Sequence, residues 1–161
     1  MIIYYLEAKL EIFCNITKSV VPKLIRDQNT VKSFIFLSKD FTENKCLCVF
    51  IPDRGENHPT VLNKSSLIYD SLKKGSLFPY VEIAYKENYS FLIMNPNFTK
   101  DSSGKSMSEY TDHYSHCEYI WNEYVSGKRY EYIIVIAHQL ASISLIKLVN
   151  RFSMNNVNIR K

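Results

Sequence analysis

The chain has 161 residues, of which 46% are hydrophobic, and its formal net charge is +4 at pH 7. A chain of this length and apolar content can remove about 70% of its unfolded surface from water in one core, which excludes an intrinsically disordered protein and predicts a single domain over residues 1–161. The charge is mild and acidic residues are spread among the basic ones, so no continuous basic surface indicates nucleic-acid binding.

Hydrophobic periodicity and turn residues predict an alternating order of helices and strands. Apolar residues at helical spacing from Leu6 to Val20 predict a first helix that stops before Pro22. Gly75 divides two later helical stretches, and the short D-F-T-E-N segment makes the first two strands adjacent or hairpin-like. The predicted helices are residues 4–21, 63–74, 77–88, 110–127 and 139–151, and the predicted strands are residues 33–38, 45–51, 90–94 and 131–137.

This order predicts an α/β fold with a mostly parallel sheet and helices on both faces. Residues 98–108 are polar and contain Ser102, Ser103 and Gly104, so we expect a mobile surface loop. Glu7 interrupts the apolar amino terminus, and no apolar run reaches about 18 residues, so we expect neither a signal peptide nor a membrane span. The four cysteines form no C-x-x-C pair and are predicted to be reduced residues of an intracellular protein.

Residues 132–142 read Y-I-I-V-I-A-H-Q-L-A-S, which predicts a buried strand, a sharp turn and a helix. This is the arrangement of the nucleophile elbow in α/β-hydrolases, where G-x-S-x-G places a serine hydroxyl on the turn. Here Gln139 stands in the serine position, flanked by His138 and Leu140, and Ala137 and Ala141 stand in the glycine positions. The pattern therefore predicts a hydrolase-like scaffold with a degenerate elbow that has no catalytic residues.

His113, His116 and Cys117 fall on one short helical segment, so a metal site is conceivable there. His113 and Cys117 are separated by one helical turn, but only two or three ligands of the right kind converge. We therefore predict packing residues, and we expect neither a metal nor a cofactor.

Three further features have a chemical and a structural interpretation. His138 follows the strand directly, and we expect it to hold its own turn by hydrogen bonds, with a role as general base as the alternative. Ser142 or Ser144 is an alternative nucleophile, although both fall inside the predicted helix. Tyr130 and Tyr132 lie among basic residues and could stack RNA bases, but half-buried aromatic residues are also expected at the start of a strand.

Five segments, in this order along the chain, carry a resemblance to a known family. They are S-F-I-F-L-S-K-D (33–40), C-L-C-V-F-I-P (46–52), M-N-P-N (94–97), H-C-E-Y-I-W (116–121) and I-V-I-A-H (134–138). The chain resembles the Argonaute-binding-protein-two (Arb-type) domain family, and more closely its animal branch of co-transcriptional regulators. The resemblance implies an α/β-hydrolase-like fold. Family members belong to an Argonaute small-RNA chaperone complex acting in heterochromatin, or are linked to Argonaute and splicing.

The chain departs from the pattern of this family at two segments. Where animal relatives commonly read I-H-G-S-G after the second strand, this chain has Ile51, Pro52, Asp53, Arg54 and Gly55. Where they read A-H-S-Y-G-G at the elbow, it has Ala137, His138, Gln139, Leu140, Ala141 and Ser142. In a working hydrolase the first of these segments helps to supply backbone N–H groups to an oxyanion. Pro52 has no N–H to donate, and Asp53 brings a negative charge. We therefore predict a degenerate oxyanion segment beside the degenerate elbow.

The resemblance implies a non-catalytic interaction domain in RNA silencing, heterochromatin or co-transcriptional (splicing) regulation. Its expected partners are proteins such as Argonaute or splicing and chromatin factors, in the nucleus and/or the cytoplasm, and direct RNA binding stays open. Two alternatives remain, namely the product of a truncated, decaying paralogue and a divergent serine hydrolase.

The chain ends about 20 residues after the elbow, before the strands that would complete a hydrolase sheet. We therefore predict an incomplete α/β-hydrolase-like fold without a complete catalytic triad. The strand at residues 131–137 would have one unpaired edge, which predicts self-association or a partner that adds a strand.

Overall fold

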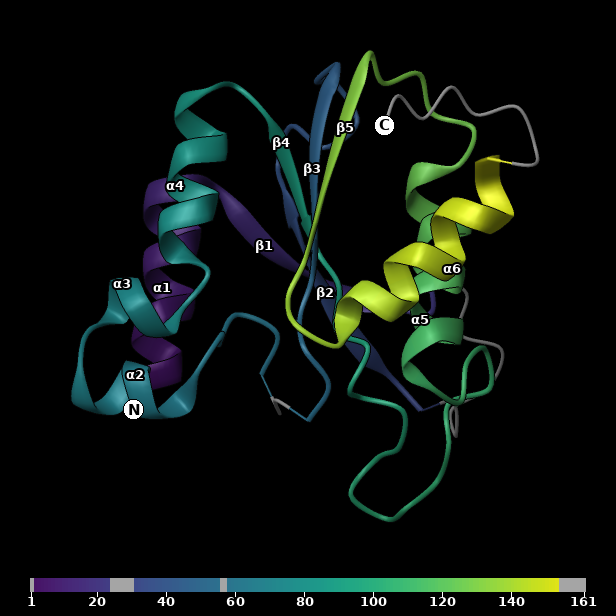
Figure 1. Ribbon diagram of the computed structural model, residues 1–161, viewed down its shortest axis with the longest axis horizontal. Helices are drawn as coiled ribbons and strands as arrows, with labels where there is room; N and C mark the ends of the chain where they lie inside the picture. The colour runs from purple at the N-terminus through teal and green to yellow at the C-terminus, as the bar shows by residue number, and fades with distance from the viewer. Residues whose placement is uncertain (1, 24–30, 56–57, 154–161) are drawn as a thin grey trace.

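The computed structural model describes residues 2–23, 31–55 and 58–153. Helices and strands alternate along most of the chain (Figure 1). The helices are α1 (Ile2–Cys14), α2 (Lys64–Tyr69), α3 (Leu72–Gly75), α4 (Phe78–Lys86), α5 (His113–Ile120), the π-helical turn η1 (Trp121–Val125) and α6 (Ala141–Ser153). The strands are β1 (Ile16–Val21), β2 (Ser33–Ser38), β3 (Cys46–Ile51), β4 (Ser90–Ile93) and β5 (Tyr132–Ala137).

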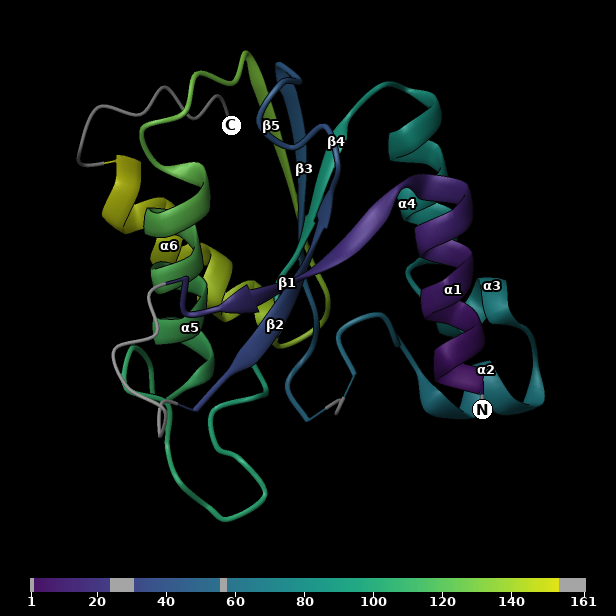
Figure 2. The ribbon, with the colours of Figure 1, turned by 180° about the vertical axis from the view of Figure 1, so that it is seen from behind.

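The strands form one sheet in the order β1-β2-β4-β3-β5. β4, β3 and β5 are parallel, so that Val49 lies opposite Leu92 on one side and Val135 on the other. β2 and β1 extend this parallel part with antiparallel pairings. Helices α1 to α4 cover one face, and α5, η1 and α6 cover the other (Figures 1 and 2). The predicted α/β fold with helices on both faces is confirmed, and its parallel pairing is confined to the three strands at the β5 end.

The first predicted helix is too long. α1 ends at Cys14, Asn15 follows with a φ of 52°, and residues 16–21 form β1 instead of continuing the helix. The left-handed conformation of Asn15 breaks the helix, and the segment I-T-K-S-V-V after it is rich in β-branched residues that favour a strand. The predicted helix at residues 4–21 is therefore wrong over its last third.

The first two predicted strands are both present, but they do not form a hairpin. β4 lies between β2 and β3, and the N–H of Phe91 donates a hydrogen bond to the Ser38 hydroxyl at 2.8 Å. β3 and β4 are parallel, so the chain crosses over through α2, α3 and α4 before it returns to the sheet. A parallel pair needs such a crossover, and because β4 returns to the sheet between β2 and β3, it separates the two strands that were predicted to be adjacent.

The core has one apolar layer on each face of the sheet. In β3, Leu47, Val49 and Ile51 pack into the layer under α5 and α6, whereas Cys48 and Phe50 pack into the layer under α1 and α4. Successive side chains of a strand point to opposite faces, so a strand covered by helices on both sides is apolar throughout. None of the helices in the described ranges is long and apolar enough to cross a membrane.

The polar segment at residues 98–108 forms a hydrogen-bonded turn. Asp101 accepts hydrogen bonds from the backbone N–H groups of Ser103 and Lys105, and Lys100 pairs with Ser106 as an isolated bridge. Residues 102–106 are exposed, while Met107 is buried. The mobility predicted for this loop stays a prediction.

Candidate functional site

The predicted strand, turn and helix around Gln139 are all present. β5 ends at Ala137, the N–H of His138 donates to the carbonyl of Ile51 at 3.0 Å, and α6 begins at Ala141. Gln139 has a φ of 48°. A positive φ at a residue other than glycine is strained, and such strain is a feature of the turn that carries the nucleophile in α/β-hydrolases. The backbone therefore has the geometry of an elbow, with an amide side chain in the serine position.

The backbone N–H that follows the elbow residue is occupied by a carboxylate. Leu140 N–H donates a hydrogen bond to Oδ1 of Asp53 at 2.9 Å. In hydrolases the corresponding N–H is one of the donors that stabilise the oxyanion. Pro52, next to Asp53, has no N–H that could serve as a second donor. The predicted oxyanion segment does lie at the elbow, where it presents a negatively charged acceptor.

Two side chains from other elements fix the segment at residues 52–55. The Asn97 amide donates to the carbonyl of Asp53 at 2.7 Å and accepts from the N–H of Gly55 at 3.2 Å. Gly55 has a φ of 90°, which a residue with a side chain rarely adopts. His113 donates from Nε2 to the carbonyl of Pro52 at 3.1 Å. These contacts hold Asp53 beneath the start of α6.

The buried His113 ring joins this loop to α6. A carbonyl oxygen only accepts, so Nε2 carries the proton, and in the neutral ring Nδ1 accepts from the Ser144 hydroxyl at 2.9 Å. Burial lowers the pKa of His113 and favours this neutral form. Ser144 is thus the serine that meets a potential base, but its side chain is fully buried, which closes it to substrate. The exposed Ser142 hydroxyl donates to the carbonyl of Gln139 at 2.8 Å instead.

The residues considered for a metal site serve as packing groups. His116 accepts at Nε2 from the backbone N–H of Asn95 at 3.1 Å, and its ring meets the Tyr110 ring edge-on at 4.5 Å. Complete burial lowers the pKa of His116 to about 3. The Cys117 sulfur lies 3.9 Å from Nδ1 of His113. Over residues 2–23, 31–55 and 58–153, no group of three or more His, Cys, Asp or Glu side chains could hold a metal ion.

Among the residues that it describes, the structure does not show the hydrogen bond expected from Nδ1 of His138, whereas Tyr130 has the structural role expected at the start of a strand. Nδ1 of His138 is buried and has no hydrogen-bond partner in the described part of the chain, so the main chain, and not this ring nitrogen, holds the turn. The Tyr130 hydroxyl donates a hydrogen bond to the carbonyl of Phe41 at 3.0 Å, which agrees with a structural role for this side chain. Tyr132, in contrast, is 64% exposed.

Sequence reasoning missed the roles of Asn97 and of the contact between His113 and Ser144. The available signal was the M-N-P-N segment, because an Asn immediately after an apolar strand and a proline often holds a turn through its side chain. The contact of His113 with Ser144 joins residues 31 positions apart, and no local pattern reports such a pair.

Comparison with known proteins identifies the family. The Arb2 domain matches residues 2–108, which is more than half of the chain. The chain belongs to the Arb2 domain family. It is 25% identical over 126 residues to a FAM172 family protein homolog of Caenorhabditis elegans, a match that covers 78% of this chain and 40% of that protein.

Other relatives carry the name cotranscriptional regulator ARB2A homolog. The protein of Dictyostelium discoideum is 40% identical over 65 residues, covering 40% of this chain and 17% of its own length. The protein of Xenopus tropicalis is 34% identical over 89 residues, covering 55% of this chain and 21% of its own length. The chain thus spans less than half of the length of these relatives.

A solved structure supports the fold. The structure of the histone deacetylase Clr3 superposes with a TM-score of 0.53 at 21% sequence identity and covers 91% of this chain and 22% of that chain. A coverage of 91% extends beyond the residues 2–108 that the Arb2 domain matches. At this level of identity the likeness concerns the fold alone.

Proposed function

We propose that the chain is a non-catalytic interaction domain that acts through protein partners in co-transcriptional regulation. The observation that carries the proposal is the hydrogen bond from Leu140 N–H to Asp53 beside a glutamine in the elbow position. The relatives named cotranscriptional regulator supply the biological setting. In this interpretation the hydrolase-like fold serves as a scaffold whose reactive turn is closed by its own carboxylate.

The chemistry at the elbow opposes acyl transfer for two physical reasons. The Gln139 amide has no hydroxyl or thiol that a neighbouring base could activate. A developing oxyanion would also lie against the Asp53 carboxylate and compete with it for the Leu140 N–H. Loss of one such donor alone costs about 10² to 10³ in rate, and a like charge beside the oxyanion adds to that cost.

A more specific proposal concerns the partners of the chain and its location in the cell. We propose that the partners are Argonaute proteins or splicing and chromatin factors, and that the domain acts in the nucleus and/or the cytoplasm in RNA silencing, heterochromatin or splicing. These assignments rest on the family resemblance, since the mild net charge of +4 does not indicate a particular ligand.

Affinity purification of the tagged chain followed by mass spectrometry tests the proposal. Recovery of Argonaute or spliceosomal proteins is expected, and recovery that survives ribonuclease treatment would show that the contact is with protein. A Val49→Asp variant is the control, because a carboxylate on this fully buried position of β3 should unfold the domain and abolish capture. Equal capture by both forms would contradict a folded interaction domain. Absence of specific partners would favour the decaying paralogue.

A second candidate, a divergent serine hydrolase, has one observation in its favour. Ser144 and His113 form a hydrogen-bonded pair at 2.9 Å, the contact expected between a nucleophile and its base. Ser144 is fully buried, so this function would require α6 to move away from α5. A fluorophosphonate probe that labelled Ser144 in the folded chain would support this candidate.

A further inference from the structure

The outer edge of β5 has no neighbouring strand among the residues that the structure describes. β5 lies at the end of the strand order and pairs on its other side with β3. Its six residues, Y-I-I-V-I-A, include no charge and no proline. Charges and prolines are the usual means by which proteins prevent an edge strand from pairing with another chain. This edge therefore offers unprotected N–H and C=O groups to a further strand.

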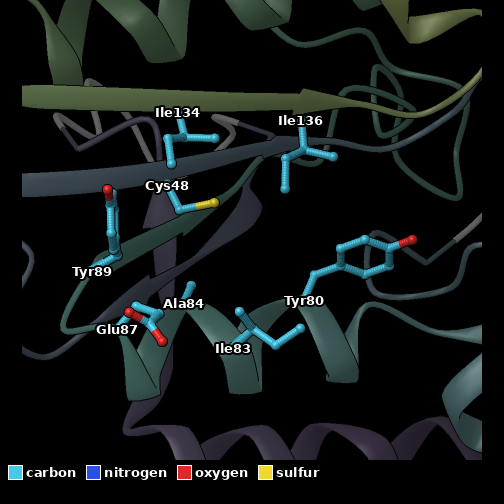
Figure 3. A pocket seen from close by; sticks show the side chains of 8 residues that line it. All are labelled: Cys48, Tyr80, Ile83, Ala84, Glu87, Tyr89, Ile134 and Ile136. Carbon is cyan, nitrogen blue, oxygen red and sulfur yellow. The ribbon is translucent and has the colours of Figure 1, made fainter.

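On the α4 side of the sheet, an apolar groove runs beside this edge (Figure 3). It encloses about 170 Å³ between β5 and α4, with Ile134 and Ile136 on the strand and Tyr80 and Ile83 on the helix. Ile134 is 46% exposed and Ile83 is 61% exposed. The helices of this face thus leave the β5 end of the sheet uncovered.

On the opposite face, α6 carries a second exposed apolar stripe, formed by Leu140 just before the helix and by Ile143 and Ile146 within it. The buried side of α6 is formed by Ala141, Ser144 and Leu148, whereas Ile143 and Ile146 lie on its exposed side. β5 and α6 lie toward the viewer in Figure 1, with β1 behind them, and Figure 2 shows the reverse from the back. Apolar surface therefore flanks the free edge on both faces of the sheet.

We propose that two copies of this chain associate through their β5 strands, paired antiparallel about a two-fold axis, so that one sheet runs through both copies. In an antiparallel pair, directly opposite residues point to the same face. Pairing Ile134 with the partner's Ile134 places Tyr132 opposite the partner's Ile136. The axis then brings α4 next to the partner's α4 and α6 next to the partner's α6.

Self-complementarity is the reason to assign a second copy of the chain to this edge. In a two-fold interface the same patch faces itself, so a patch of like charge would repel, whereas an apolar patch associates. A stable interface takes about 800 Å² from each partner. Seven large apolar side chains that are between 44% and 64% exposed contribute to that area. They are Tyr80, Ile83, Tyr132, Ile134, Leu140, Ile143 and Ile146.

Sedimentation of the purified chain across micromolar concentrations tests the inference. We expect a closed dimer whose dissociation constant rises by about 100-fold or more in Ile134→Lys, because two like charges then meet at the axis. Ile68→Lys is the matched control, since Ile68 is 64% exposed on α2, outside the proposed surface, and should leave the dissociation constant unchanged. Circular dichroism and thermal unfolding of dilute samples establish that both variants are folded.

Hydrogen exchange supplies a second readout that a change in folding would not imitate. Amide protection in β5 should increase with the concentration of the wild-type chain, and this increase should disappear in Ile134→Lys. A monomer at every concentration, a dimer that Ile134→Lys leaves intact, or open-ended oligomers in place of a closed dimer would each overturn the proposal. The outcome is independent of the proposed function, because neither substituted residue, Ile134 or Ile68, takes part in the hydrogen bond between Leu140 and Asp53 on which that proposal rests.

Discussion

Gln139 adopts a φ of 48°, a conformation that costs a residue with a side chain about 1–2 kcal/mol. The surrounding bonds compensate for this cost. Ala141 N–H donates to the carbonyl of His138 at 3.0 Å, and Asp53 accepts from Leu140 at 2.9 Å. The second of these contacts occupies the N–H that a working site would leave open for the oxyanion.

Restoring the serine is therefore expected not to restore activity. Gln139→Ser would supply a hydroxyl without a base, since Nδ1 of His138 is buried and Asp53 still occupies the Leu140 N–H. Ester hydrolysis should stay at background, and a fluorophosphonate probe should label neither the wild type nor the variant. Clear turnover, or labelling that heat denaturation abolishes, would contradict this.

The Ser144 hydroxyl is expected to contribute to stability through His113. Ser144→Ala removes the donor to the buried Nδ1, which leaves that nitrogen without its partner and should lower the free energy of unfolding by about 1–3 kcal/mol. Urea unfolding measures the change. The exposed Ser142→Ala is the control and should cost less than about 1 kcal/mol. An equal decrease in the free energy of unfolding in the two variants would show that the hydrogen bond between Ser144 and His113 contributes no more to stability than the exposed one of Ser142.

At the scale of elements, Gly75 allows two short helices to pack closely. A Cβ built on Gly75 would lie 2.2 Å from the backbone nitrogen of Leu67 in α2, and backbone atoms cannot move aside as a side chain can. We expect Gly75→Ala to destabilise the fold by about 1–3 kcal/mol or more through overpacking.

Gly104→Ala is an informative comparison for this prediction. Gly104 has a φ of 83° but open space around its Cβ position, so its substitution reports the cost of the conformation alone, about 1–2 kcal/mol. Urea unfolding of both variants measures the two effects. A Gly75→Ala variant as stable as the wild type would mean that α2 and α3 shift apart freely.

Most helices and strands could be predicted because each has a local sequence pattern. The prediction failed where contacts between residues far apart in the chain determine the structure. β5 and the turn at Gln139 were predicted from an apolar run and from Ala137 and Ala141 in the glycine positions of the elbow pattern, and both are present. The prediction of a hairpin failed because the position of β4 between β2 and β3 depends on contacts such as that of Ser38 with Phe91, which are 53 positions apart. The long first helix failed because apolar residues at positions 16 and 20 suit both a helix and a strand. The contacts that hold Asp53 in place were missed for the same reason, since Asn97 is far from it in the chain.

In the whole molecule, two buried histidines connect the α5 layer to the end of the sheet. His113 bonds to the carbonyl of Pro52 after β3, and His116 accepts from the backbone of Asn95 after β4. His116 accepts its bond only as a neutral ring, whereas His113 uses its neutral form to accept from Ser144 at Nδ1. Burial lowers the pKa of each histidine, that of His116 to about 3. The charge state of His116 therefore decides how firmly α5 is attached to the end of β4.

The protein is consequently expected to lose stability in mild acid. The ordinary pKa of histidine is about 6.5, so between pH 6.5 and about 3 the unfolded chain binds protons that the folded chain excludes. The free energy of unfolding then rises with pH in this window and levels off above it. His116 alone should make the protein roughly 2 kcal/mol less stable at pH 5 than at pH 7.5. Urea unfolding at the two values measures the difference.

A His116→Gln variant separates this effect from the titration of other groups. The glutamine side chain can still accept from the N–H of Asn95 but does not titrate, so the variant should lose most of the difference in stability between pH 5 and pH 7.5. Its stability at pH 7.5 decides whether the polar contact itself is preserved. An unchanged difference in the variant would assign the acid sensitivity to other groups and would mean that His116 takes up its proton without loosening α5 from the sheet.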